Sequence, residues 1–485
     1  MMTKRIVALI LAVLTLSMCT CTVIAAPNVP AEITSISTNA VLLYEANSGA
    51  VLYQDNANSH IYPASTTKIL TAIIVIDLCE GNSLIGDITA YFKDDNTWSI
   101  TDGYSDKVFS FDDVVTVTLP ETRGSVLGLR EGEKMSVRDL LYGMMLVSGN
   151  DCARALANYF SPDDAIGGFA KVMNAYAKEL GAVNSTFKVP HGLHLDDHQT
   201  TAYDMALITA YALKNDEFRK IVATETYKIG PTNKHAEGFE IENTNRLIHT
   251  KDDDPQSYKY EYAIGVKTGD TDAAGRCIVA AAEKDGKTLI AVLMGDYENS
   301  RIGSPRYENS ARLFEYGFNN FTLIKAADLD IEPLINADII GADTGTVQLK
   351  ADLDNATLCF NNSELDTIKD NAKYLTMKTS FSTDDGKLHA PLEGGDVVGT
   401  VQFMYKDEVV LSTELIATAS VKKSDGNSVT GVERSDSAEE ELEGYDWIFW
   451  LLLFCLLLVI ILVIIALTRQ PMKRRNSQLR RHRRR

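Results

Sequence analysis

The sequence predicts an α+β fold, followed by a small β-rich domain and one transmembrane helix. Between about 40 and 320, helical patterns alternate with short strand pairs joined by tight turns, which is typical of α+β folds. From 321 to 420 the chain consists of short alternating polar and apolar runs separated by turn residues, a pattern that indicates strands. Residues 447–467 form an uncharged stretch of 21 residues, long enough as a helix to cross a bilayer core of about 30 Å.

The first 26 residues predict a cleaved secretory signal. Lys4 and Arg5 precede an apolar run over 6–16, and small residues follow near 23–26. This order of a basic start, an apolar centre and a small-residue end is the pattern of export signals. We therefore expect the mature chain to begin at about residue 27.

The part from 27 to 320 is expected to hold the α+β domain. A hairpin is predicted over 40–55, where two β-rich runs flank Asn47-Ser48-Gly49, and a second hairpin over 276–295 turns at Asp285-Gly286. Amphipathic periodicity predicts helices in the run that begins at Ser65 and over 136–160, 164–182, 201–215 and 304–321.

The two ends of the chain differ in charge from its body. Residues 421–446 are polar and acidic and predict a disordered stalk. The tail, 468–485, holds nine Lys and Arg and no acid, so the positive-inside rule places it in the cytoplasm and the body outside. The chain between signal and tail carries 36 basic against 66 acidic residues. Such a body repels phosphate backbones, so nucleic acid is not an expected partner. Membrane lipid is an expected partner of the apolar stretch 447–467.

Cysteine usage does not indicate a metal or a disulfide framework. Outside the signal and the apolar stretch, the cysteines are Cys79, Cys152, Cys277 and Cys359. Their spacing matches no metal motif and pairs none of them. We expect buried free thiols.

Three short motifs could carry chemistry. Ser65 stands three residues before Lys68, a spacing that brings two side chains together on one helix face. A serine hydroxyl needs an adjacent base to become a nucleophile, and a desolvated lysine can be that base. Ser148-Gly149-Asn150 follows 83 residues after Ser65, and Lys267-Thr268-Gly269 another 119 residues on. Each motif alone is weak, since a helix start, a loop and an exposed strand end also produce them, but Ser-x-x-Lys, Ser-x-Asn and Lys-Thr-Gly in this order form a known catalytic trio.

With these motifs the chain resembles the D-alanyl-D-alanine carboxypeptidases, the low-molecular-mass serine penicillin-binding proteins of the β-lactamase/transpeptidase-like superfamily. The resemblance covers about residues 36–420 and includes GLREGEKMSVRDLLYGMMLVSGNDCA, PHGL followed by TAYDMA, and GVKTGDTDAAGRCIVAAAEKDGKTLIAVLMG. It implies a five-stranded antiparallel sheet flanked by helices, with the active site between sheet and helices, and an appended β-rich domain. It also implies that peptidoglycan stem peptides are the substrate, that β-lactam antibiotics are covalent inhibitors, and that no cofactor or metal is needed.

The resemblance also implies roles for the motif residues. Ser65 would attack the D-Ala-D-Ala carbonyl, with Lys68 as its base, and the backbone N–H groups of Ser65 and Asp270 would hold the oxyanion. Ser148 would relay a proton to the leaving amine, and Asn150 would position Lys68 and the substrate. In the strand, Lys267 and Thr268 would hold the terminal carboxylate, while Gly269 lets the substrate lie against the strand edge.

This sequence departs from the family pattern at three places: Val189 before Pro-His-Gly-Leu, the long segment 87–113, and the acidic Asp270 after Lys-Thr-Gly. Which residue activates the deacylating water is left open, with Lys68 as the first choice. Asp270, as an acid beside the site for the substrate carboxylate, could weaken binding of the anionic substrate, or it could be solvated and have no effect on binding. We favour the second.

Several other functions are alternatives. His191, His194, Asp196, Asp197 and His198 lie within eight residues and could suggest a zinc peptidase, but Gly192 and the aspartates indicate a loop, whereas zinc ligands usually come from separate segments or one helix face. No Gly-x-Ser-x-Gly occurs for a Ser-His-Asp hydrolase. A β-lactamase would lack the β domain and anchor. A β-lactam sensor would need a cytoplasmic domain larger than 18 residues. A non-catalytic wall-binding scaffold remains open.

Overall fold

The computed structural model describes residues 29–86, 88, 108–161, 166–250, 257–296, 305–354, 356–371, 375–383 and 385–424. The predicted signal, most of the segment 87–113, and almost all of the predicted stalk, membrane helix and tail lie outside these residues. Within the described ranges, no helix is both long and apolar enough to cross a membrane.

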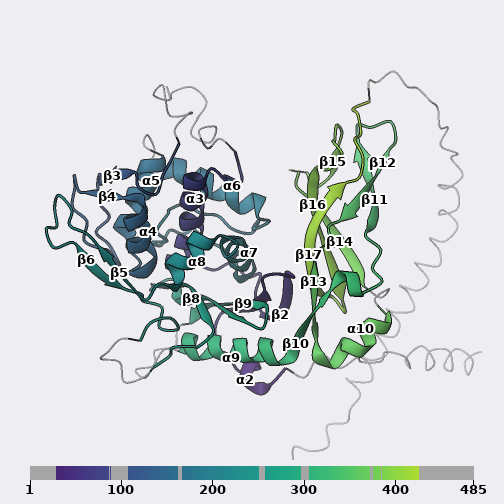
Figure 1. Cartoon of the computed structure of the whole chain (residues 1–485), viewed down its shortest axis with the longest axis horizontal. Helices are drawn as coiled ribbons and strands as arrows, with labels where there is room; N and C mark the ends of the chain where they lie inside the picture. Colours follow the sequence, from purple (N-terminus) through teal and green to yellow (C-terminus); the bar gives the residue numbers. More distant parts are fainter. Residues whose placement is uncertain are drawn as a thin grey trace, which may run out of the picture. The chain divides into compact units, whose positions relative to one another are not determined.

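A five-stranded antiparallel sheet forms the centre of the first domain, in the order β2-β1-β9-β8-β7 (Figure 1). Its strands are β1 (Ala40–Glu45), β2 (Ala50–Asp55), β7 (Ala263–Thr271), β8 (Gly275–Lys284) and β9 (Lys287–Asp296). Both predicted hairpins are confirmed. In the first, the carboxylate of Glu45 accepts from the backbone N–H and the hydroxyl of Ser48, each at 2.7 Å, and Gly49 takes a φ of +73° that glycine adopts without strain. β7 lies at one edge of the sheet.

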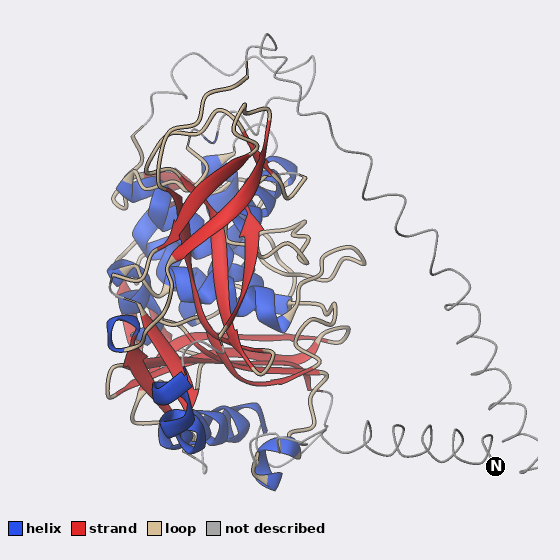
Figure 2. Cartoon of the chain, turned by 90° about the vertical axis from the view of Figure 1, so that its right-hand side faces the viewer, coloured by secondary structure: helices blue, strands red, loops and turns tan. Residues whose placement is uncertain are grey.

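Helices cover both faces of this sheet (Figures 1 and 2), so that each face buries its apolar side chains against another layer. Along β9 the burial alternates: Ile290, Val292 and Met294 enter one hydrophobic core, while Leu289, Ala291 and Leu293 enter the other. The first core lies under α3 (Lys68–Glu80), α4 (Val137–Leu146), α5 (Asn150–Phe160), α6 (Gly167–Glu179), α7 (Ala202–Ala212) and α8 (Asp216–Ala223), and the second under α2 (Ala31–Thr34) and α9 (Pro305–Asn320).

Short elements complete this domain. The helix expected to include Ser65 instead begins at Lys68, because Ala64–Thr67 form a 3₁₀ turn, η1, and Ala64 has a φ of +49°. Two small antiparallel strand pairs were not predicted from the sequence: β3 (Val114–Thr116) with β4 (Lys134–Ser136), and β5 (Thr226–Ile229) with β6 (Phe239–Glu242).

The part after α9 is rich in strands, as the alternating runs predicted. A six-stranded sheet has the order β14-β16-β17-β12-β11-β15, and β10 pairs with β13. Inward-facing Leu349, Phe403 and Leu415 belong to a core of their own. The elements are β10 (Phe321–Lys325), η3 (Ala326–Asp328), β11 (Leu334–Ile340), β12 (Thr346–Ala351), β13 (Thr357–Asn361), η4 (Asn362–Glu364), α10 (Leu365–Asn371), β14 (Thr376–Phe381), β15 (Leu388–His389), β16 (Val397–Tyr405) and β17 (Glu408–Ala417).

Candidate active site

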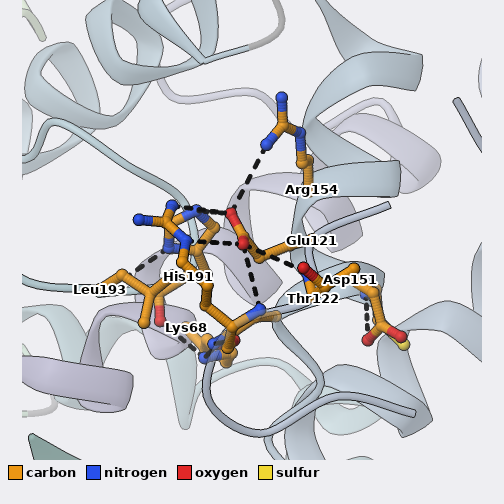
Figure 3. Close-up of polar contacts among 10 residues, drawn as sticks. Lys68, Glu121, Thr122, Asp151, Arg154, His191 and Leu193 are labelled. Atoms are coloured by element: carbon orange, nitrogen blue, oxygen red, sulfur yellow. Dashed lines mark hydrogen bonds and ion pairs between the residues drawn. The ribbon is translucent and has the colours of Figure 1, made fainter. Parts of the chain in front are cut away.

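Lys68 is the centre of a buried polar group at the start of α3. Its Nζ lies 2.9 Å from Ser65 Oγ, 2.7 Å from Asn150 Oδ1 and 2.6 Å from the carbonyl oxygen of His191. The Lys68 side chain is fully buried, and Figure 3 shows it beside His191. Burial, aided by the positive charge of Lys267, holds the pKa of Lys68 well below its ordinary value, because a low-dielectric interior disfavours the charged form.

The loop between α4 and α5 brings the second motif to this lysine. Ser148 takes a φ of +62°, which ends α4 and lets Asn150 begin α5. Asn150 is fixed on three sides, since its backbone N–H donates to the carbonyl of Ser125 at 2.8 Å, its Nδ2 donates to that of Arg123 at 2.8 Å, and its Oδ1 faces Lys68. Ser148 is buried beside it, although its hydroxyl makes no hydrogen bond to Lys68 or Lys267 within the described part of the chain.

Asp151 supports this loop, and the sequence analysis assigned it no role. Its fully buried carboxylate accepts from the backbone N–H groups of Leu127, Gly128 and Leu129 at 2.8–2.9 Å, and from that of Cys152 at 2.9 Å. Backbone N–H groups buried without such an acceptor would be costly. Asp151 therefore ties the chain around 127–129 to the first turn of α5, next to Asn150.

The third motif lies on the edge strand β7. A Cβ built on Gly269 would lie 3.0 Å from the backbone nitrogen of Ser65, so β7 passes directly beside the turn that holds Ser65. Lys267 is buried, and its Nζ donates to the carbonyl of Thr268 at 3.2 Å. Burial, with the charge of Arg306, lowers the pKa of Lys267 to about 7. Asp270 is 64% exposed and lies 3.9 Å from Arg276, so its carboxylate is solvated as expected.

Arg306 of α9 and Thr244 were missed by the sequence analysis. Arg306 Nη1 donates to the carbonyls of Gly269 and Cys277, both at 3.2 Å, which places a permanent positive charge behind β7. Thr244 Oγ1 lies 3.5 Å from Thr268 Oγ1. A single arginine and a single threonine in ordinary surroundings carry no sequence signal that could have identified them.

A carboxylate also lies beside the site. Glu121 accepts from Arg123 Nε and Nη2 at 2.9 and 3.0 Å, and it lies 3.5 Å from Arg154 and 3.9 Å from His191 Nε2 (Figure 3). The hydrogen bonds from Arg123 lower the pKa of Glu121 to about 2. Glu121 is thus ionised and paired, and a carboxylate of so low a pKa is a poor proton acceptor.

The three histidines considered as zinc ligands have separate partners. His191 Nδ1 accepts from the backbone N–H of Leu193 at 3.2 Å, His194 packs edge-on against Tyr62 with ring centres 4.6 Å apart, and His198 Nε2 lies 2.9 Å from Thr67 Oγ1. Over the described ranges, no three His, Cys, Asp or Glu side chains gather as metal ligands would. In the same ranges Cys152, Cys277 and Cys359 are buried free thiols, as expected, whereas the free thiol of Cys79 is only half-buried.

A hydroxyl beside a buried amine whose pKa is lowered by burial can attack a carbonyl and become acylated. A neighbouring strand edge with cations behind it can hold an anionic substrate group. Together with the α+β fold, this arrangement defines the class of serine acyl hydrolases. The structure brings Ser65, Lys68 and Asn150 into direct contact, with Gly269 alongside, and places Ser148, Lys267, Thr268 and Asp270 on the two adjoining segments.

Comparison with known proteins agrees with this class. Residues 25–298 match the family described as D-alanyl-D-alanine carboxypeptidase, and residues 336–423 match the C-terminal domain of penicillin-binding protein 5. The chain belongs to the D-alanyl-D-alanine carboxypeptidase family.

Relatives of this kind are found in Bacillus subtilis, Escherichia coli and Haemophilus influenzae. The chain is 28% identical over 387 residues to the D-alanyl-D-alanine carboxypeptidase DacF of Bacillus subtilis. This alignment covers 79% of this chain and 86% of the relative. It is 29% identical over 395 residues to the D-alanyl-D-alanine carboxypeptidase DacC of Escherichia coli, and that alignment covers 81% of this chain and 86% of the relative. Among solved structures, penicillin-binding protein 5 of Haemophilus influenzae is similar to this chain, with 25% sequence identity and a TM-score of 0.51. The superposition covers 80% of this chain and 98% of that structure.

Proposed function

We propose that this protein is a serine D-Ala-D-Ala carboxypeptidase that removes the terminal D-alanine from peptidoglycan stem pentapeptides through an acyl-enzyme on Ser65. The observation that carries the proposal is the buried Lys68 Nζ, 2.9 Å from Ser65 Oγ. Family membership supports the same reaction and the same inhibitors, the β-lactams.

The partners of Lys68 favour proton transfer from Ser65. Asn150 Oδ1 and the carbonyl of His191 can only accept hydrogen bonds, and they lie 2.7 and 2.6 Å from Nζ. A neutral amine has two N–H bonds and one lone pair. If both N–H bonds donate to these two acceptors, the lone pair faces the Ser65 hydroxyl, which then donates to Nζ. Lys68 is thereby oriented as the general base for the attack.

The remaining motif residues complete the reaction. The backbone N–H groups of Ser65 and Asp270 stabilise the oxyanion, usually the largest single contribution in such sites. Lys267 and Thr268 hold the terminal carboxylate of the substrate, with Arg306 adding positive charge from behind the strand. Ser148 returns a proton to the leaving D-alanine, and water activated by Lys68 releases the acyl group.

Turnover is the direct test. The protein incubated with a stem pentapeptide that ends in D-Ala-D-Ala should yield the tetrapeptide and free D-alanine, detected by mass spectrometry, and prior treatment with penicillin should stop the reaction. Penicillin labelling without release of D-alanine would leave a non-catalytic scaffold or sensor. Rapid hydrolysis of penicillin in place of stable labelling would indicate a β-lactamase.

Lys267→Ala tests the carboxylate site. Losing this charge-assisted contact should reduce kcat/KM by a factor of about 10 to 150, corresponding to roughly 1.5–3 kcal/mol. A substrate with an amidated C-terminus should be poor for the wild type and scarcely worse for the variant. Since burial lowers the pKa of Lys267 to about 7, kcat/KM of the wild type for the free carboxylate should also fall as the pH rises above 7. Equal sensitivity of both proteins to amidation would contradict the role.

The division of the chain and its location are part of the proposal. We assign a signal peptide to 1–26, the catalytic domain to 27–320, a β-rich domain to 321–420, an acidic stalk to 421–446, a transmembrane helix to 447–467 and a basic cytoplasmic tail to 468–485. The catalytic domain then faces outward, where mature peptidoglycan is.

Truncation and protease protection test this topology. A chain from Ala26 to Lys423 should be soluble and as active as the whole protein, because the described contacts of the proposed site all come from segments between Ser65 and Arg306. The full chain should fractionate with the membrane. Protease added to intact protoplasts should remove the body and spare the tail. Cleavage of the tail with a protected body would reverse the orientation and refute the assignment.

A further inference from the structure

The peptide unit between Ala64 and Ser65 is held on its carbonyl side by residues from a distant loop. A Cβ built on Gly192 would lie 1.8 Å from the carbonyl oxygen of Ala64, and Gly192 has a φ of +83°, so only glycine lets the loop approach this closely. Thr67 Oγ1 donates to the same oxygen at 2.8 Å. The Ala64 carbonyl is therefore covered by the loop and bound by Thr67.

His198, from the same loop, extends this contact. The backbone N–H of Lys188 can only donate, and it lies 2.9 Å from His198 Nδ1, so Nδ1 is the accepting nitrogen and the neutral ring carries its proton on Nε2. Nε2 lies 2.9 Å from Thr67 Oγ1 and so donates to it, which directs the Thr67 hydroxyl proton to Ala64. Burial lowers the pKa of His198 to about 4, so the ring is neutral at physiological pH.

This chain of hydrogen bonds affects Ser65 because a trans peptide unit is rigid and planar. Its C=O and N–H point in opposite directions, so contacts that orient the carbonyl of Ala64 also orient the N–H of Ser65. That nitrogen faces β7, 3.0 Å from where a Cβ of Gly269 would lie. Ala64 adopts its φ of +49° although it has a side chain, a conformation that the surrounding contacts must stabilise.

We propose that Thr67 and His198 are positioning residues that direct the backbone N–H of Ser65 at the substrate carbonyl oxygen, the atom that becomes the oxyanion. The inference rests on the proposed role of Ser65 as nucleophile. A hydrogen bond accepted by the carbonyl of a peptide unit also polarises the amide and strengthens its N–H as a donor. Both side chains are buried, so they act through the Ala64–Ser65 peptide unit.

Thr67→Val tests the inference, because valine keeps the shape of threonine but can neither donate to Ala64 nor accept from His198. We expect acylation by penicillin to slow about tenfold, part of the 10²–10³ that a lost oxyanion donor costs. In infrared difference spectra of the acyl-enzyme, formed with penicillin labelled with ¹³C at the β-lactam carbonyl, the ester carbonyl band should move to higher wavenumber, since a weaker hydrogen bond polarises the carbonyl less. Thr67→Ser, which keeps the hydroxyl, should retain both the rate and the band.

Thr209→Val is the matched control. Thr209 is fully buried and donates to the carbonyl of Met205 at 2.7 Å within α7, so the substitution removes the same kind of bond without contact to the Ser65 turn. Its rate and carbonyl band should match those of the wild type. His198→Gln, tested in the same way, provides a second variant if Thr67→Val does not fold.

The outcomes separate this inference from the proposed function. A Thr67→Val or His198→Gln protein that folds, acylates Ser65 within twofold of the wild-type rate and shows an unchanged carbonyl band overturns the positioning role. Wild-type protein that is not acylated on Ser65 would instead remove the proposed nucleophile. A shift of the band that is equally large in Thr209→Val would also overturn the inference, because it would show a general loss of packing.

Discussion

Replacing Ser65 with alanine is expected to abolish covalent labelling of the protein by a fluorescent penicillin. A β-lactam presents a strained amide and a carboxylate in the arrangement of the terminal dipeptide, so we expect Ser65 Oγ to open the ring and form an ester. The neighbouring hydroxyls of Thr66 and Thr67 donate to the carbonyls of Pro63 and Ala64 at 2.7 and 2.8 Å and are buried, so they cannot replace it. Gel fluorescence measures the label, and peptide mass spectrometry locates it.

Thr66→Ala serves as the control for this experiment, because it removes an adjacent hydroxyl from the same turn. It should leave Ser65 labelled. An adduct on another residue, or a label that persists in Ser65→Ala, would show that the nucleophile has been assigned to the wrong side chain.

The second large effect is expected for Lys68→Ala, which should lower the acylation rate constant by a factor of about 10²–10⁴. The variant keeps the Ser65 hydroxyl but has no amine to take its proton. The acceptors on Asn150 and His191 lose their partner, yet removing a buried amine also removes its desolvation cost, so the fold should be retained. Stopped-flow measurement of penicillin acylation gives the rate, and circular dichroism reports the fold.

Lys287→Met separates loss of the base from loss of a buried lysine. Lys287 is also buried, and its Nζ donates to the carbonyls of Phe318 and Phe321 at 2.6 and 2.7 Å, at the end of α9. This substitution should reduce thermal stability and leave acylation unchanged. Near-normal acylation of Lys68→Ala would mean that a different group is the base.

Features that depend on neighbours in the chain could be predicted from the sequence. The three-residue spacing of Ser65 and Lys68 brings their side chains together in one helical turn, and the structure confirms the contact at 2.9 Å. The two sheet hairpins follow from turn residues such as Gly49 and Gly286, whose positive φ values few other residues adopt. The β-rich character of residues after 321 was likewise evident from alternation alone.

The motif order indicated that Ser148 and Lys267 belong with Ser65 only through resemblance to a family. Spacing along the chain does not predict that Asn150 contacts Lys68, which lies 82 residues away in the sequence. The same limit applies to the 3₁₀ turn at Ala64, because local propensity favours a continuous helix there and contacts with the distant loop at Gly192 decide otherwise.

The sequence by itself determined the α+β class, the two sheet hairpins and the Ser65–Lys68 pair, because periodicity and turn chemistry are local properties. The tertiary structure alone decided that the Asp151 carboxylate accepts hydrogen bonds from four backbone N–H groups and that Arg306 lies behind β7. It also decided that His198 bonds to Thr67, 131 positions away in the sequence. Such contacts join segments whose proximity depends on how helices and strands pack around one sheet. A histidine, an arginine or an aspartate has the same local sequence signal whether its side chain lies in solvent or beside the proposed nucleophile.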